Sequence, residues 1–144
     1  MSKVDVWWSW LALSIMWMGV IYALSDRPAG DLNQVMIAVS YLPFASTFSH
    51  IALYLILSIF VLRTLVLANS LPTGLKIYLT LFVALVYGIL DEFHQSNIKG
   101  RSSEVNDVIA DVFGAVLVVL FWYAYKIKHK TGVARTSDRR RDEG

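Results

Sequence analysis

The chain has no cysteine, so disulfides, thiolate metal sites and a cysteine nucleophile are excluded. It also has little excess charge, and a formal net charge of +2 is too small to indicate nucleic acid as a partner. No nucleophile motif, glycine-rich phosphate loop or pair of His ligands on one helix is present. These absences weaken an enzymatic interpretation without excluding it, and we expect no cofactor.

Hydrophobic residues, in contrast, make up 56% of the 144 residues and are concentrated in long runs. A membrane-spanning helix needs ~20 predominantly apolar residues, and four blocks are about that long. The blocks run from about Val6 to Leu24, His50 to Ala68, Leu75 to Gln95 and Glu104 to Tyr125. We therefore predict an all-α, polytopic membrane protein built as a bundle of four transmembrane helices.

The first block has a competing interpretation as a signal peptide that is cleaved near Ala23-Leu24-Ser25. The apolar core of a signal peptide is only ~7–15 residues long, and this block is longer. Trp7, Trp8 and Trp10 at its start also suit a membrane interface, where amphipathic rings gather. We expect the block to be retained as the first transmembrane helix.

Two further segments do not fit a membrane span. Residues 32–48 are partly apolar but are interrupted by Asn33, Gln34, Ser40 and Pro43, which favours a short interfacial or re-entrant segment. Residues 126–144 carry many charges and almost no aliphatic side chains, so they cannot bury enough surface to fold. The predicted organisation is a membrane domain over residues 1–125 and a basic, disordered tail over residues 126–144.

Lysine and arginine are distributed unevenly about the predicted helices. With four spans both termini share one side, and of the 13 basic residues only Arg27, Lys99 and Arg101 fall on the other side. Basic flanks mark the cytoplasmic side of a membrane protein. We predict cytoplasmic termini and membrane lipids as immediate partners, while the oligomeric state stays open.

The third predicted helix ends in an unusual group of polar residues. Tyr87, Asp91, His94 and Gln95 are spaced i, i+4, i+7 and i+8, so they share one helical face. Glu92 lies about 100° round the helix from Asp91, so the two acids need not have the same role.

Polar residues also occur at the matching level of the neighbouring predicted helices. His50 and Tyr54 are one turn apart near the start of the second helix, and Asp107 and Asp111 are one turn apart near the start of the fourth. Because the third helix ends where these two begin, we expect the side chains to converge at the outer face. The candidate ligand-binding residues are His50, Tyr54, Asp91, Glu92, His94, Gln95, Arg101, Asp107 and Asp111.

Each candidate residue also has a structural interpretation. Asp107 could cap the fourth helix, where it would accept from free backbone N–H groups. Arg101 could pair with Asp91 or Glu92 and hold two helices in register without contributing chemistry. A functional pocket and structural polar packing therefore both remain open for the cluster as a whole.

The same residues resemble those of the VanZ-like family of small bacterial membrane proteins. The resemblance spans about residues 10–125 and rests on His50-x-x-x-Tyr54, Asp91-Glu92-Phe93-His94-Gln95, Gly100-Arg101-Ser102 and Asp107-x-x-x-Asp111-x-x-Gly114. The family often has Lys where this chain has Ser49, and Asn where it has Asp111. The family takes its name from a protein linked to resistance against the glycopeptide teicoplanin. The resemblance therefore implies work at the outer face of the bacterial cytoplasmic (inner) membrane.

Our preferred hypothesis is a binding protein whose outer polar pocket holds a lipid headgroup, an envelope precursor or an amphiphilic drug of the glycopeptide type. In such a pocket Arg101 would hold a phosphate or carboxylate, and Gln95 and Tyr54 would donate hydrogen bonds. Such binding could contribute to resistance against antibiotics or envelope stress. A proton or ion pathway is a weaker alternative, because four spans leave little room for one.

The main alternative is a membrane enzyme that acts on such a molecule and uses Asp91, Glu92, His50 and Arg101. In that case a divalent ion could be held by His50, Asp91, Asp107 and Asp111. The spacing of these residues matches no compact metal motif, so we predict no metal site.

Overall fold

The computed structural model describes residues 6–27, 45–68 and 70–142, and these residues form four helices and no strand. The helices are α1 (Trp7–Ser25), α3 (Ala45–Ala68), α4 (Thr73–Gln95) and α5 (Val105–Asp142). Each contains a stretch that is long and apolar enough to cross a membrane. The predicted all-α bundle of four transmembrane helices is confirmed. Most of the predicted interfacial or re-entrant segment lies outside the described residues, and its last residues, 45–48, begin α3.

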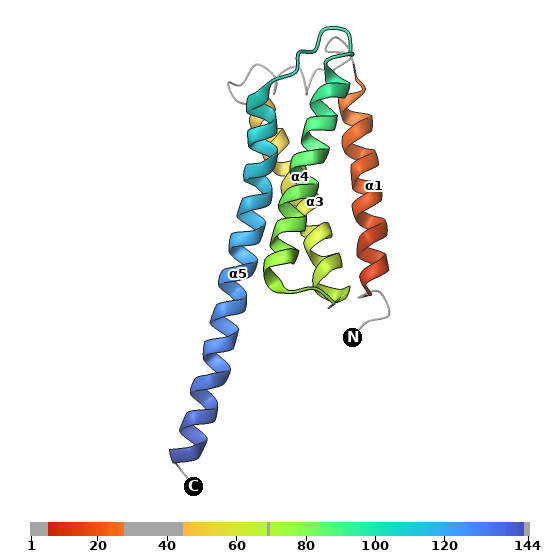
Figure 1. Ribbon diagram of the computed structural model, residues 1–144. Helices are drawn as coiled ribbons and strands as arrows, with labels where there is room; N and C mark the ends of the chain where they lie inside the picture. The colour runs from red at the N-terminus through yellow and green to blue at the C-terminus, as the bar shows by residue number, and fades with distance from the viewer. Residues whose placement is uncertain (1–5, 28–44, 69, 143–144) are drawn as a thin grey trace.

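Successive helices run in opposite directions, so the start of α1 and the end of α5 lie at the same end of the bundle (Figure 1). Helix α3 makes the most extensive contacts, chiefly with α5 and α1, and both α3 and α4 touch all three other helices. The other end brings together the end of α1, the start of α3, the end of α4 and the start of α5. We call it the polar end, for the residues that it gathers.

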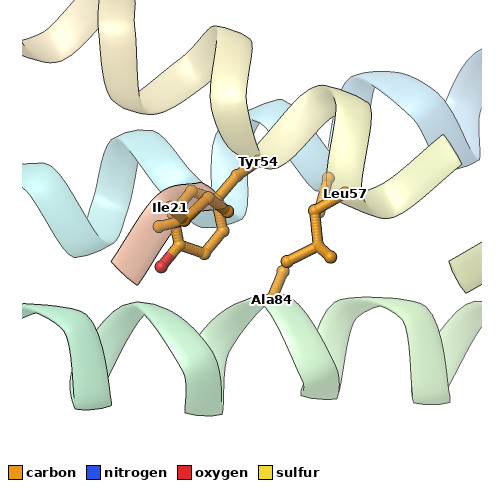
Figure 2. Packing of buried hydrophobic residues seen from close by; sticks show 5 residues of the cluster. Ile21, Tyr54, Leu57 and Ala84 are labelled. Atoms are coloured by element: carbon orange, nitrogen blue, oxygen red, sulfur yellow. The ribbon is translucent and has the colours of Figure 1, made fainter. Parts of the chain in front are cut away.

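The apolar core is small and lies where all four helices meet. It consists of Ile21, Tyr54, Leu57, Ala84 and Ala115, and Figure 2 shows Tyr54 and Leu57 of α3 facing Ile21 and Ala84. Larger hydrophobic side chains such as Phe93 and Phe121 point outward and are more than 70% exposed. This arrangement suits a lipid surround, in which apolar side chains need no burial and small residues allow close helix contact.

Gly114 sets the closest approach of α3 to α5. A Cβ at this position would lie 2.6 Å from the backbone oxygen of Ile51 and 3.0 Å from the backbone nitrogen of Leu55. Because those neighbours are backbone atoms that cannot turn aside, only glycine allows this crossing. The crossing fixes the height at which the polar residues of α3 and α5 face one another.

Helix α5 is much longer than the predicted fourth span. Its membrane-compatible stretch ends at His129, and the helix then continues to Asp142, past the ends of the other helices (Figure 1). The sequence predicts a disordered tail from residue 126, whereas the structure continues the helix there. Residues 126–142 contain no proline and include seven Lys and Arg residues, which are favourable in helices even without tertiary packing.

Candidate functional site

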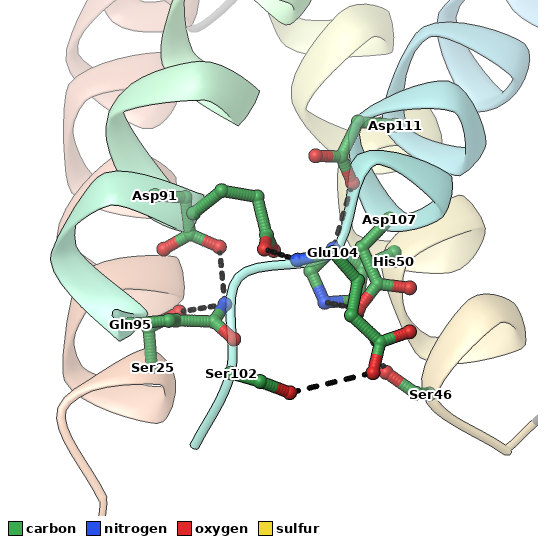
Figure 3. A network of polar contacts seen from close by, with 10 residues as sticks. Ser25, Ser46, His50, Asp91, Gln95, Ser102, Glu104, Asp107 and Asp111 are labelled. Atoms are coloured by element: carbon green, nitrogen blue, oxygen red, sulfur yellow. Dashed lines mark hydrogen bonds and ion pairs between the residues drawn. The ribbon is translucent and has the colours of Figure 1, made fainter. Parts of the chain in front are cut away.

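The polar end buries most of the charged residues that the sequence places there. His50, Asp91, Glu92, Gln95, Asp107 and Asp111 are each at most 6% exposed. Figure 3 shows them in two groups, one between α4 and α1 and the other between α3 and α5. The predicted convergence of three helices is therefore present, but it does not produce a single cluster.

The first group holds the end of α4 against the end of α1. The Gln95 side-chain amide donates to Asp91 Oδ2 at 2.9 Å and to Ser25 Oγ at 3.3 Å. Its neighbour His94 donates from Nε2 to Asp26 Oδ1 at 3.2 Å and stacks on Tyr22. The predicted shared face of α4 thus packs on α1, and the Gln95 amide, expected to serve a ligand, is engaged within the protein.

The second group, which we call the His50 cluster, comprises His50, Glu92, Asp107 and Asp111. Nδ1–H of His50 donates to Asp111 Oδ1 at 2.9 Å, and both side chains are buried. The other ring nitrogen, Nε2, lies 3.6 Å from Asp107 Oδ2, which also accepts from the Ser46 hydroxyl at 3.2 Å. A buried imidazole is therefore held between two carboxylates one turn apart on α5.

Glu92 brings α4 into the His50 cluster. Its Oε2 accepts from the backbone N–H of Glu104 at 2.7 Å, directly before α5 begins. Its Oε1 is buried and has no hydrogen-bond partner among the described residues. One side-chain ligand atom each of Glu92, His50 and Asp107 lie within 4.8 Å of one another. The two adjacent acids therefore have different partners, since Asp91 accepts from Gln95 on its own helix and Glu92 accepts from the chain directly before α5.

Gly88 of α4 provides the space that the Asp111 carboxylate occupies. A Cβ at Gly88 would lie 2.6 Å from Asp111 Oδ2, so any larger residue would displace the carboxylate. That oxygen is buried and has no hydrogen-bond partner in the part of the chain that the structure describes. Gly88 thus leaves the space that lets Asp111 reach His50.

The loop from α4 to α5 positions Arg101 at the edge of the polar end. The backbone N–H of Arg101 donates to the Ile98 carbonyl at 3.1 Å, which closes a tight turn. Gly100 has a φ of 82°, a value that the third residue of a type II turn requires and that glycine adopts without strain. The Arg101 side chain is half-buried and forms no ion pair with a described residue, so the pairing with Asp91 or Glu92 considered from the sequence is not formed.

The structure therefore sorts the predicted residues by their surroundings. Tyr54 lies beneath the His50 cluster, fully buried and stacked on the His50 ring, and its hydroxyl has no partner. Sequence reasoning missed Ser46 and Gly88. Ser46 lies one turn before His50, so the same i, i+4 spacing could have found it, but the predicted second span began too late. Gly88 gave no signal, because its role depends on a contact with another helix.

An apolar groove of about 480 Å³ occupies the opposite half of the bundle. It lies between α3 and α5, beyond their crossing at Gly114, and its walls include Ile59, Leu62, Leu117 and Phe121. Val66 of α3 and Tyr125 of α5 line it farthest along their helices from the polar end. This apolar groove and the buried polar residues are therefore separated by the close contact of α3 with α5 at Gly114.

Chemically, the polar end offers mainly acceptor oxygens. Three buried carboxylates surround the His50 imidazole, a fourth lies in the first group, and a half-buried guanidinium lies at the edge. Such a set can accept hydrogen bonds from a hydroxyl or ammonium group, bind a cation, or use His50 as a base oriented by Asp111.

Comparison with known proteins gives one match. A family model described as VanZ/LLP1 matches residues 10–127, a range that contains all four membrane-compatible stretches except the first residues of α1 and the last of α5. None of the curated proteins and none of the solved structures matches the chain.

Proposed function

Because the chain belongs to the VanZ/LLP1 family, we propose that it is a cell-envelope membrane protein whose polar end binds the headgroup of an amphiphile. The amphiphile would be a lipid, an envelope precursor or a drug of the glycopeptide type, and binding would contribute to resistance against antibiotics or envelope stress. The observation that carries this proposal is the half-buried Arg101, which forms no ion pair with the described residues although four carboxylates are buried at the same end.

Arg101 supports an anionic headgroup for two reasons. A guanidinium binds phosphate or carboxylate through paired, charge-assisted hydrogen bonds, which are about twice as strong as neutral ones. In addition, the turn at Gly100 fixes the backbone of Arg101 close to the start of α5. Binding therefore does not have to order the backbone of a long loop. The unpartnered Glu92 Oε1 would accept from a hydroxyl or ammonium group of the same headgroup.

The binding experiment uses the purified chain in detergent, with short-chain phosphatidylglycerol, a polyprenyl phosphate and teicoplanin as separate probes. Losing a charged hydrogen bond costs about 1.5–3 kcal/mol, so Arg101→Gln should weaken binding of the recognised probe about 10- to 100-fold. Lys99→Gln, two residues away on the same loop, is the matched control and should bind as the wild type does. Equal binding by Arg101→Gln and wild type, or an equal loss in Lys99→Gln, would overturn the proposal.

The proposal also requires the polar end to face outward from the bacterial cytoplasmic membrane, with both termini in the cytoplasm. The distribution of lysine and arginine supports this orientation. Single cysteines at Ser96 and Ser137, labelled on intact cells with an impermeant thiol reagent, provide the test. Labelling at position 96 alone is expected, and labelling at position 137 alone would reverse the orientation.

One observation favours the enzymatic alternative. His50 is oriented by the buried Asp111 through Nδ1, and this leaves Nε2 available as a base, an arrangement common to many hydrolytic sites. Of the residues first considered for this role, Asp91 is engaged by Gln95, so the base would be His50 or Glu92. Recovery of the probe after incubation decides between the two functions, since an unchanged probe indicates binding and a cleaved or modified probe indicates catalysis.

A further inference from the structure

The polar end has an imbalance of buried charge. Asp91, Glu92, Asp107 and Asp111 are all buried there, whereas His50 is the one buried basic side chain that accompanies them in the described parts of the chain. Asp91 accepts a hydrogen bond from the Gln95 amide, which also donates to Ser25 of α1. The remaining three acids surround His50, and burying several carboxylates is costly unless a cation accompanies them.

The distance between His50 and Asp107 is unusual for a direct contact. Nε2 lies 3.6 Å from Asp107 Oδ2, which is beyond the range of about 2.7–3.2 Å for a hydrogen bond of this kind. Two ligands of a tetrahedral zinc ion, each with a bond of about 2.0–2.1 Å, lie about 3.3 Å apart. The observed separation is therefore closer to that of two ligands of one metal ion than to that of a donor and an acceptor.

Glu92 supplies a third ligand atom from a third helix. Its ligand atom lies within 4.8 Å of those of both His50 and Asp107. Glu92 is only 3% exposed, and its Oε1 has no partner because the bond from Glu104 engages Oε2. One oxygen thus fixes the carboxylate, and the other is buried and available as a metal ligand.

Asp111 accepts a hydrogen bond from His50, as carboxylates commonly do from histidines that bind a metal. A ligating His usually donates its other ring N–H to a carboxylate, which fixes the tautomer and the orientation of the ring. Here Nδ1–H of His50 donates to Asp111 at 2.9 Å, which leaves the Nε2 lone pair directed to the side of Asp107. Gly88 provides the space in which Asp111 makes this contact.

We propose that His50, Glu92 and Asp107 bind one divalent transition-metal ion of the zinc type, with Asp111 as a positioning residue for His50. An imidazole among the ligands favours zinc-like metals over magnesium or calcium, which prefer oxygen ligands alone. The ion would join α3, α4 and α5 at the polar end, and three protein ligands leave a fourth tetrahedral position for water or an oxygen of a bound molecule. The site differs from the metal set considered from the sequence, because Glu92 takes the place of Asp91 and Asp111 supports the ligand His50.

The test measures zinc binding by the purified, tag-free chain in detergent after removal of metal with a chelator. Wild type should bind one zinc ion per chain and show a raised melting temperature in its presence. Asp107→Asn and Glu92→Gln should weaken zinc binding at least tenfold, and Asp111→Asn about 10- to 100-fold as expected for a positioning carboxylate. The matched controls are His94→Gln and Asp91→Asn, a histidine and a buried acid at the same end, and both should bind zinc as the wild type does.

Two results would overturn the site. One is a folded wild type that binds no zinc at micromolar concentrations, and the other is an equal loss of zinc in the controls and the ligand variants. Should the variants fail to fold, X-ray absorption spectroscopy of the zinc-loaded wild type still tests the site. One histidine nitrogen and at least two carboxylate oxygens are expected among the zinc ligands. A zinc coordination shell without histidine would exclude the site. The Arg101→Gln variant should retain zinc, so a failure of headgroup binding remains distinguishable from a failure of this proposal.

Discussion

The two halves of the bundle hold the same helices together by different means. At the polar end, the buried side chains of His50, Glu92 and Asp111 join α3, α4 and the start of α5 through directional hydrogen bonds, from His50 to Asp111 and from the backbone N–H of Glu104 to Glu92. In the opposite half, α3 and α5 diverge and leave an apolar groove lined by residues such as Ile59 and Leu117. Near this groove, Arg63 of α3 stacks over the Trp10 ring of α1 at 5.6 Å.

This difference follows from the solvent that surrounds a membrane helix. Lipid tails are as apolar as leucine, so opening an apolar groove between two helices to lipid costs little. A buried carboxylate has no such substitute, because lipid cannot donate a hydrogen bond to it. The polar end should therefore determine which helices are neighbours and at what height, while the opposite half adapts to them.

The largest expected effect is the loss of the His50–Asp111 pair. Removing one partner of a buried ion pair leaves the other uncompensated, so Asp111→Ala should cost about 3–5 kcal/mol of folding free energy. Thermal or denaturant unfolding of the purified protein in detergent measures the effect. Asp111→Asn keeps the size of the side chain and one acceptor, so it should lose less. A melting temperature unchanged in Asp111→Ala would show that the polar end does not hold the helices together.

A smaller effect is expected at the crossing that divides the two halves. Gly114→Ala would bring a Cβ to 2.6 Å from the Ile51 backbone oxygen, so α3 and α5 must separate. Overpacking of this kind typically costs about 1–3 kcal/mol. The matched control is Gly19→Ala in α1, where nothing lies within 4 Å of the added Cβ, and the higher helix propensity of alanine should stabilise the protein by about 0.5–1 kcal/mol. Effects of the same sign for both variants would contradict the close contact at Gly114.

The smallest effect should come from the groove itself. Ile59 is 41% exposed, so lipid or detergent can replace the atoms that Ile59→Ala removes. We expect a loss below about 1 kcal/mol, in contrast to the 2–5 kcal/mol typical of a fully buried isoleucine. Unfolding measurements on Ile59→Ala and Leu117→Ala provide the comparison. Losses of 2 kcal/mol or more would mean that these side chains are covered in the folded protein by something other than lipid.

The sequence was sufficient for the membrane helices because hydrophobic length is a local property. The predicted spans beginning at Val6 and Leu75 match α1 and α4 to within two residues at each end. The second span was predicted to begin at His50, whereas α3 begins at Ala45, because polar Ser46 and Ser49 concealed its first turn. The helical extension of α5 was not predicted either, since low hydrophobicity excludes a packed core but does not exclude a helix.

For the candidate site, the sequence determined which residues share a face and a level. The spacing of Asp91 and Gln95, and of Asp107 and Asp111, follows from 3.6 residues per turn and needs no tertiary information. The polarity of these residues within apolar helices likewise indicated that they needed partners inside the bundle.

Only the tertiary structure decided which partner each residue has. Helical periodicity fixes the angle between two side chains on one helix, but the rotation of each helix about its own axis depends on packing against its neighbours. Gly114 and Gly88 permit close contacts that turn Asp107 and Asp111 toward His50. The same packing gives two adjacent acids different partners. Glu92 accepts from the backbone N–H of Glu104, directly before α5, whereas Asp91 accepts from Gln95, whose amide also donates to Ser25 of α1.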